Sequence, residues 1–409
     1  MESLAIRTEI PHTSTRQLLL LPSVFMFWLV GLIDKFAFGT ILTDKRFLAD
    51  LHLGGHAAVI GALASAAILT QALGNGVFGW AVDRFGPRRC AMVGVVGWFL
   101  SCVLGAVAGS IGVLVVSRLL LGLCEGYTWP VGNALTARWF PAGRRGRARA
   151  MWMSAVCIGP GIAGFVTGGL LGSFSWRGVF WFLAALSLLV CLPMATYFVK
   201  DGPARDRAAD SGRQLAAVAG RALRSSRFWL ATGAASGTTI SVWALATWLP
   251  TYLVSYRHTS LGTFQYYVLG AYALGLVVML GYSYLVDRLR RLAGWLAVAF
   301  TVAGALLLIV GFVPSSPYFV LIACTTAIIY GITLLIVQGF QDRMTAVNQV
   351  GTENGLMNAV SNVFAGVVPF AMGGLIELAG GSFSYAFGFL FVLLLISAGC
   401  AAVLHRLGY

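Results

Sequence analysis

Four ionisable residues lie well inside long apolar stretches of this 409-residue sequence, away from the ends of those stretches. Asp34 and Lys35 are in the first such stretch, and Arg118 and Glu125 are in the fourth. A charged side chain at the centre of a membrane helix costs about 2.5 to 3.5 kcal/mol on insertion scales, so these residues are expected to face one another or a wet cavity. Their formal charges sum to zero.

The spacing predicts how the four side chains are arranged on two helices. Arg118 and Glu125 are seven positions apart, which places them on one face of a helix about two turns from each other. Asp34 and Lys35 are adjacent and therefore point about 100° apart, so one can face a partner helix while the other faces a cavity.

Two interpretations of the four charges are open. The structural one is a salt-bridge lattice between the first and fourth helices. The functional one is a coupling site, because burial favours the neutral form of a carboxyl group and Asp34 or Glu125 could then take up a proton near neutral pH. A neutral acid would leave Lys35 or Arg118 without a counter-charge, and the cavity would attract an anion.

Other sequence patterns that could indicate a nucleotide, metal or catalytic site are weak or absent. The run from Gly159 to Gly164 satisfies G-x-G-x-x-G, but no strand precedes it and it lies in an apolar stretch, which favours a kink or close packing. A G-x-x-x-x-G-K-[ST] motif does not occur, and the five histidines and seven cysteines show no metal spacing. We expect no cofactor, no metal and no enzymatic activity.

The composition predicts a polytopic membrane protein. Apolar residues make up 58% of the chain, charged residues only 10%, and the mean hydropathy is +0.84. Because a crossing needs roughly 20 apolar residues, the sequence divides into twelve predicted spans. They cover residues 18–42, 56–80, 90–109, 112–138, 149–172, 177–199, 228–254, 264–286, 293–313, 317–340, 354–379 and 383–404.

The basic residues predict the orientation and the division of the chain. With the N-terminus inside, 22 of the 28 Lys and Arg lie in inner segments and four in outer ones, as expected when basic loops stay cytoplasmic. The net charge of +14 then reflects topology, and no nucleic-acid partner is expected. Residues 200–227 are the predicted linker between a first six-helix bundle, 1–199, and a second one, 228–409.

A repeated segment supports duplication. Asp83-Arg84 follows the second predicted span and Asp287-Arg288 follows the eighth, an offset of 204 residues. Two related six-helix halves with a site between them near the midplane are typical of such a duplication.

The segment from Gly79 to Arg89, GWAVDRFGPRR, resembles the signature loop of the major facilitator superfamily. The resemblance implies an all-helical fold of two pseudo-symmetric six-helix bundles. It also implies that this loop gates the cytoplasmic side, with its acid pairing against a neighbouring helix end. The gating residues on this basis are Gly79, Asp83, Arg84, Gly86 and Arg88, with Asp287 and Arg288 in the degraded second copy.

A finer resemblance is to the anion:cation symporter branch of that superfamily. It is carried by RLLLGLCEG from Arg118 to Gly126, by Trp139-Phe140-Pro141, and by TWLPTYL from Thr247 to Leu253. The resemblance implies that Asp34 and Glu125 handle protons, and we expect Arg118 to hold Glu125 between turnovers. Lys35 stands where an arginine usually contacts the substrate carboxylate. A lysine binds a carboxylate less directionally, because its ammonium group is a point charge and not a bidentate fork.

The remaining candidates for substrate contact are Gln71, Tyr127, Asn358 and Asn362. Gln71 stands where sugar-acid carriers have a tyrosine, which favours a smaller or more apolar carboxylate. For the two asparagines, hydrogen bonding between helices is an equal alternative. Trp243 could also line a cavity, although aromatic residues of membrane helices more often pack or lie at interfaces.

The sequence therefore predicts a monomeric transporter of the inner membrane, with both termini cytoplasmic, that imports a small organic anion with protons. One alternative is a proton-driven antiporter that exports a drug or metabolite, because Gly159-Pro160 partly resembles a motif of antiporters. The other is a receptor or sensor that binds a ligand without transport.

Overall fold

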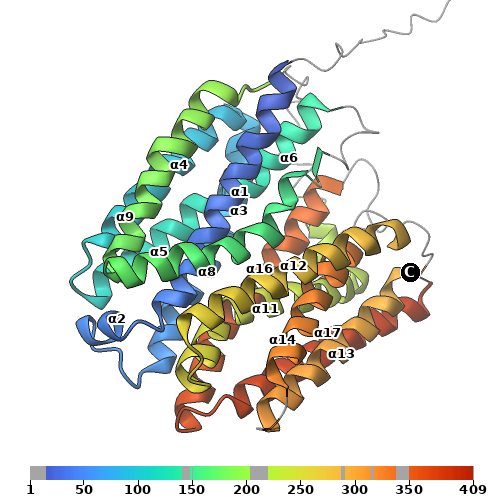
Figure 1. The fold of residues 1–409 in the computed structure, drawn as a ribbon. Helices are drawn as coiled ribbons and strands as arrows, with labels where there is room; N and C mark the ends of the chain where they lie inside the picture. Colours follow the sequence, from blue (N-terminus) through green and yellow to red (C-terminus); the bar gives the residue numbers. More distant parts are fainter. Residues whose placement is uncertain are drawn as a thin grey trace, which may run out of the picture.

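The computed structural model describes residues 15–140, 148–149, 151–202, 220–286, 291–313, 315, 317–337 and 350–408. These residues form helices, with no strand among them. Figure 1 shows two groups of helices, one drawn from blue to green and the other from yellow to red. Residues 203–219 of the predicted linker, as well as Asp287 and Arg288, lie outside the described residues.

The first group contains helices that pack mainly against one another. They are α1 (Thr15–Ile41), α2 (Lys45–Asp50), α3 (Ala57–Phe85), α4 (Pro87–Ala106), α5 (Ile111–Glu125), α6 (Thr128–Trp139), α8 (Ala155–Ser173) and α9 (Trp176–Leu186), with the π-helical stretches η1 (Ser187–Cys191) and η2 (Met194–Phe198).

The helices of the second group also pack mainly against one another. Its members are α11 (Ser226–Pro250), α12 (Leu261–Val286), α13 (Leu292–Phe312), α14 (Tyr318–Thr326), α16 (Val350–Leu378) and α17 (Ser384–Arg406), with the π-helical stretches η3 (Thr251–Tyr256) and η4 (Ala327–Thr333).

Eleven stretches of the described residues are long and apolar enough to cross a membrane. The predicted span that is not among the eleven is the seventh, residues 228–254, which corresponds to α11. This helix has 25 residues and therefore sufficient length. Helix α11 carries many hydroxyl side chains and is buried along most of its length. Because protein surrounds it, α11 needs less apolar surface than a helix that faces lipid.

The fourth predicted span, residues 112–138, is interrupted after Glu125. Helix α5 ends at Glu125, a turn covers Gly126 and Tyr127, and α6 starts at Thr128. Pro130 lacks the N–H that would continue the helical ladder to residue 126. The hydroxyl of Thr128 donates a hydrogen bond to the Glu125 carbonyl at 3.0 Å. Glu125 therefore lies at a helix terminus and not in a helix interior.

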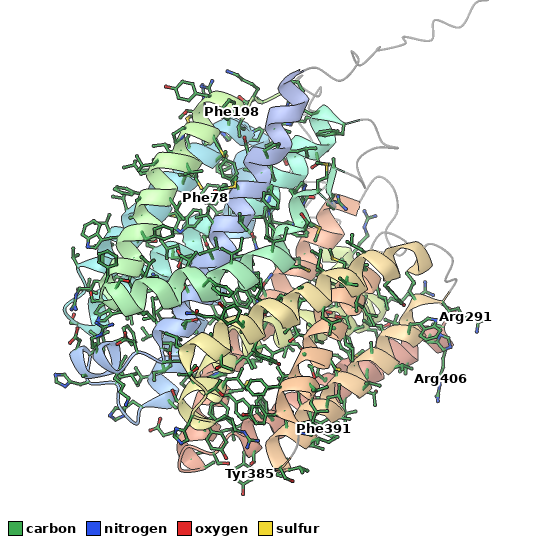
Figure 2. All side chains as sticks on the ribbon, in the orientation of Figure 1. Phe78, Phe198, Arg291, Tyr385, Phe391 and Arg406 are labelled. Atoms are coloured by element: carbon green, nitrogen blue, oxygen red, sulfur yellow. The ribbon has the colours of Figure 1, made fainter. Side chains whose placement is uncertain are left out.

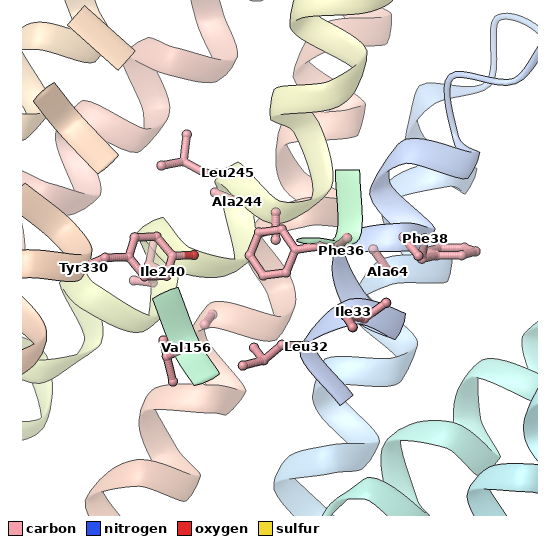
Figure 3. Packing of buried hydrophobic residues seen from close by; sticks show 14 of the residues in the cluster. Leu32, Ile33, Phe36, Phe38, Ala64, Val156, Ile240, Ala244, Leu245 and Tyr330 are labelled. Carbon is pink, nitrogen blue, oxygen red and sulfur yellow. The ribbon is translucent and has the colours of Figure 1, made fainter. Parts of the chain in front are cut away.

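The two groups meet along α3 and α16, α8 and α12, and α1 and α11. Apolar side chains fill the space between them: Figure 3 shows Phe36 of α1, Val156 of α8 and Leu245 of α11 coming together. In contrast, the basic side chains of Arg291 and Arg406 lie at one edge of the molecule (Figure 2).

The seam between α3 and α16 is very tight at one end. A Cβ atom on Gly61 would collide with the Pro369 carbonyl, and one on Gly373 would collide with the Ala57 carbonyl. The Phe370 N–H donates to the Ser65 hydroxyl at 3.1 Å, across the two groups. At this end of the seam, glycines allow the two backbones to touch.

Candidate functional site

The first ion pair joins Lys35 of α1 to Glu125 of α5. The Lys35 Nζ lies 3.1 Å from the Glu125 Oε2, and the side chains are 15% and 2% exposed. The Glu125 Oε1 has no hydrogen-bond partner among the described residues. Gly31, one turn before Lys35, makes room for the Glu125 Oε1, because a Cβ atom on Gly31 would lie 3.2 Å from this oxygen.

The second ion pair joins Asp34 to Arg118. The Arg118 Nη1 lies 3.6 Å from the Asp34 Oδ1, and both side chains are 1% exposed. The Trp98 indole N–H donates to the Asp34 Oδ2 at 2.8 Å. The guanidinium carbon of Arg118 lies 4.8 Å from the ring centroids of both Phe38 and Phe180. Aromatic faces and the carboxylate therefore hold Arg118 on several sides.

This pairing differs from the expected one, in which Arg118 holds Glu125. Seven residues along a helix correspond to about 10.5 Å of axial rise, so each charged residue of α5 finds a closer partner on α1 than on its own helix. Asp34 and Lys35 point in different directions, as predicted. Asp34 turns toward α4 and Arg118, and Lys35 toward a pocket.

A small pocket lies between α1, α3, α5 and α11, so both groups of helices contribute to it. Lys35, Arg118, Glu125 and Gln71 line it, together with mostly small or apolar residues. Its volume is about 30 Å³, which is room for roughly two water molecules. A substrate therefore needs the helices to move apart before it can enter.

Trp243 of α11 lines the pocket opposite the first ion pair. The Lys35 Nζ lies 5.1 Å from the centroid of the Trp243 ring. The Trp243 indole N–H donates to the Asn362 Oδ1 at 3.2 Å, and the Asn362 amide donates to the Asn358 carbonyl at 2.9 Å. The two asparagines of α16 thus hydrogen-bond between and within helices, and they are not among the residues that line the pocket.

Tyr127 also lies away from the pocket. Its ring is completely buried and packs edge-on against Phe27 and Phe78, at 5.7 and 6.1 Å between centroids. It covers Gly94, where a Cβ would collide with the ring. Tyr127 contributes to the packing beside Glu125 because it follows the break between α5 and α6.

The Gly79–Arg89 segment ends α3 and starts α4. Gly86 has a φ of +88°, a conformation that favours glycine. Asp83 and Arg84 are exposed, and the acid at the start of α4 is Asp201, whose Oδ1 accepts a hydrogen bond from the Arg88 N–H at 2.9 Å. Asp201 could not be predicted from the sequence, because its position in the chain gives no sign that it reaches this turn.

The described part of the chain contains no group of three or more His, Cys, Asp or Glu residues that could hold a metal ion.

Comparison with known proteins links this arrangement to transport. The sequence model of the Major Facilitator Superfamily matches residues 23–369. The chain is 29% identical over 350 residues to the "Probable sulfoacetate transporter SauU" of Cupriavidus necator, covering 80% of each protein. It is 24% identical over 399 residues to the hexuronate transporter of Bacillus subtilis, covering 90% of each.

Solved structures agree on the fold. A bacterial homolog of the human lysosomal transporter Spinster, inward-facing and unoccupied, aligns with a TM-score of 0.75 at 17% identity, covering 97% of this chain and 98% of that one. The D-xylose-proton symporter aligns with a TM-score of 0.74 at 14% identity, covering 95% and 97%.

Proposed function

Because the chain belongs to the major facilitator superfamily, we propose that it is a secondary transporter that imports a small organic anion, in particular a carboxylate, together with protons. Relatives that are named as transporters of sulfoacetate and hexuronate support an anionic substrate. The observation that carries the proposal is the Lys35–Glu125 pair, placed on a pocket to which both groups of helices contribute.

Proton uptake by Glu125 prepares the pocket for an anion. Its Oε1 can accept a proton without breaking a hydrogen bond, because it makes none with the described residues. A neutral Glu125 no longer balances the charge of Lys35, so a substrate carboxylate takes its place beside the ammonium group. Proton and anion then bind together, and neither is favoured alone.

Asp34 is the second carboxyl group in the proposed coupling, acting through Arg118, which also lines the pocket. The Asp34 Oδ2 already accepts the Trp98 N–H and the more distant Cys102 thiol at 3.6 Å. These contacts and Arg118 fix the orientation of the Asp34 carboxylate.

The site is loaded and emptied by rocking of the two groups of helices. We assign gating on one side to Gly79, Asp83, Arg84, Gly86 and Arg88, with Asp287 and Arg288 as the second copy. We further propose that the protein is a monomer of the inner membrane with both termini in the cytoplasm, because basic residues concentrate in the predicted inner segments.

Glu125→Gln tests the coupling. In proteoliposomes with a proton gradient and labelled benzoate, sulfoacetate or glucuronate as the probe, whichever the wild type accumulates, the variant should lose accumulation but keep counterflow exchange, because glutamine cannot release a proton. Glu125→Asp, which keeps a titratable acid, is the matched control and should retain partial accumulation. Wild-type accumulation by Glu125→Gln would refute the coupling role, and outward transport against an inward proton gradient would show antiport.

A further inference from the structure

Trp243 presents its ring face, not its N–H group, to the pocket. The N–H is occupied by Asn362, which is itself held by its hydrogen bonds to the backbone and side chain of Asn358, at 2.9 and 3.3 Å. These bonds fix the plane of the indole on α11. The Lys35 Nζ over the ring, at 5.1 Å, shows that the face is reachable from the pocket.

The rest of the lining offers little to a polar molecule. Apart from the ionisable residues, only Gln71 and Thr247 bring polar side chains to the pocket, and the remainder are apolar residues such as Phe38, Ile68 and Leu121. A polyhydroxylated substrate would have hydroxyl groups without partners there, and buried polar groups without hydrogen bonds are unfavourable.

The charges of the pocket set the charge of the substrate. Glu125 is the carboxylate whose neutralisation releases Lys35, the ammonium group that lies over Trp243, whereas the Asp34–Arg118 pair is the more deeply buried of the two. One released ammonium group matches one anionic group. The negative face of an aromatic ring repels an anion and attracts a cation, so the anionic group turns to Lys35 and away from Trp243.

Building on the proposed function, we propose that Trp243 determines substrate specificity, and that the site takes a monovalent carboxylate with a flat apolar body. The carboxylate pairs with Lys35 while the body lies on the indole face, replacing the contact between Lys35 and Trp243. Asn362 acts as a positioning residue, because it reaches the substrate only through the orientation of Trp243.

The test compares the affinities of purified full-length protein for benzoate, gluconate and succinate at acid pH. Benzoate supplies a flat apolar monoanion, gluconate a polyhydroxylated one and succinate a second charge. We expect benzoate to bind at least about tenfold more tightly than the other two, because an aromatic contact and the avoided burial of hydroxyls act together.

Variants show whether Trp243 causes the preference. Trp243→Ala should reduce benzoate affinity by about tenfold and leave gluconate affinity nearly unchanged, while Trp243→Phe should keep most of the preference. Trp229→Ala, on the same helix but with an exposed side chain, is the matched control and should behave as wild type. Asn362→Ala should weaken benzoate binding less than Trp243→Ala, without affecting gluconate.

The outcomes separate this inference from the proposed function. If the anions bind but Trp243→Phe and Trp243→Ala change all three affinities equally, the specificity role is excluded and the anion site stands. If the wild type binds gluconate or succinate more tightly than benzoate, the specificity role is likewise excluded and the anion site stands. If none of these anions, nor sulfoacetate or glucuronate, binds the wild type, both the inference and the anion site are excluded.

Discussion

At the scale of single residues, the two ion pairs differ in whether water or an anion can take the place of a lost partner. Asp34 and Arg118 are both 1% exposed, and Asp34 also accepts the Trp98 N–H. Lys35 is 15% exposed and lies on the pocket. A charge that loses its partner deep in the protein stays uncompensated, whereas one on a pocket can be reached by water or an anion.

This difference predicts unequal effects on stability. Asp34→Asn leaves the Arg118 guanidinium without a counter-charge and should destabilise the protein by about 3 to 5 kcal/mol, whereas Glu125→Gln should cost clearly less. Thermal unfolding of both variants in the same detergent measures the difference. Equal shifts of the unfolding midpoint would contradict the distinction between the two pairs.

At the scale of elements, the seam between α3 and α16 closes one end of the space between the two groups of helices. Gly61 and Gly373 allow backbone contact there, and the carboxylate of Glu377 on α16 accepts a hydrogen bond from the Ala58 N–H of α3 at 3.0 Å. This N–H belongs to the first turn of α3, where amide groups lack helical partners and favour negative charge. Opening this end requires the seam to separate.

Gly61→Leu should therefore hold the seam apart. Ser65 is buried beside it, so a cysteine at position 65, in a chain without the native cysteines, should react several-fold faster with a maleimide when residue 61 is leucine. Gly76→Leu is the control, because a Cβ at Gly76 meets no atom within 4 Å. Unchanged reactivity in Gly61→Leu would show that the seam does not depend on this contact.

At the scale of the whole molecule, the small pocket and the closed seam describe one stage of a cycle. The pocket of about 30 Å³ is too small for an organic anion, and a rigid site of this size could not release one. Transport thus requires the two groups of helices to separate on either side in turn.

The orientation of the cycle relative to the cell is set by the basic residues. We predict that green fluorescent protein fused after Tyr409 fluoresces and that alkaline phosphatase fused there is inactive, because the proposed topology places the C-terminus in the cytoplasm. Fusions within the turn after α1, near Lys45, should show the opposite pattern. Phosphatase activity at the C-terminus would reverse the proposed topology.

The sequence by itself determined that the protein spans the membrane, approximately where the crossings lie, and which four charges lie within the first and fourth of them. Those properties depend on the free energy of transferring each segment into lipid, which is local to the segment. The tertiary structure alone decided that Arg118 pairs with Asp34 and Lys35 with Glu125, that Tyr127 packs away from the pocket, and that Trp243 faces Lys35. These contacts join helices that are distant in the chain, and their geometry depends on how the helices pack, which no local pattern encodes.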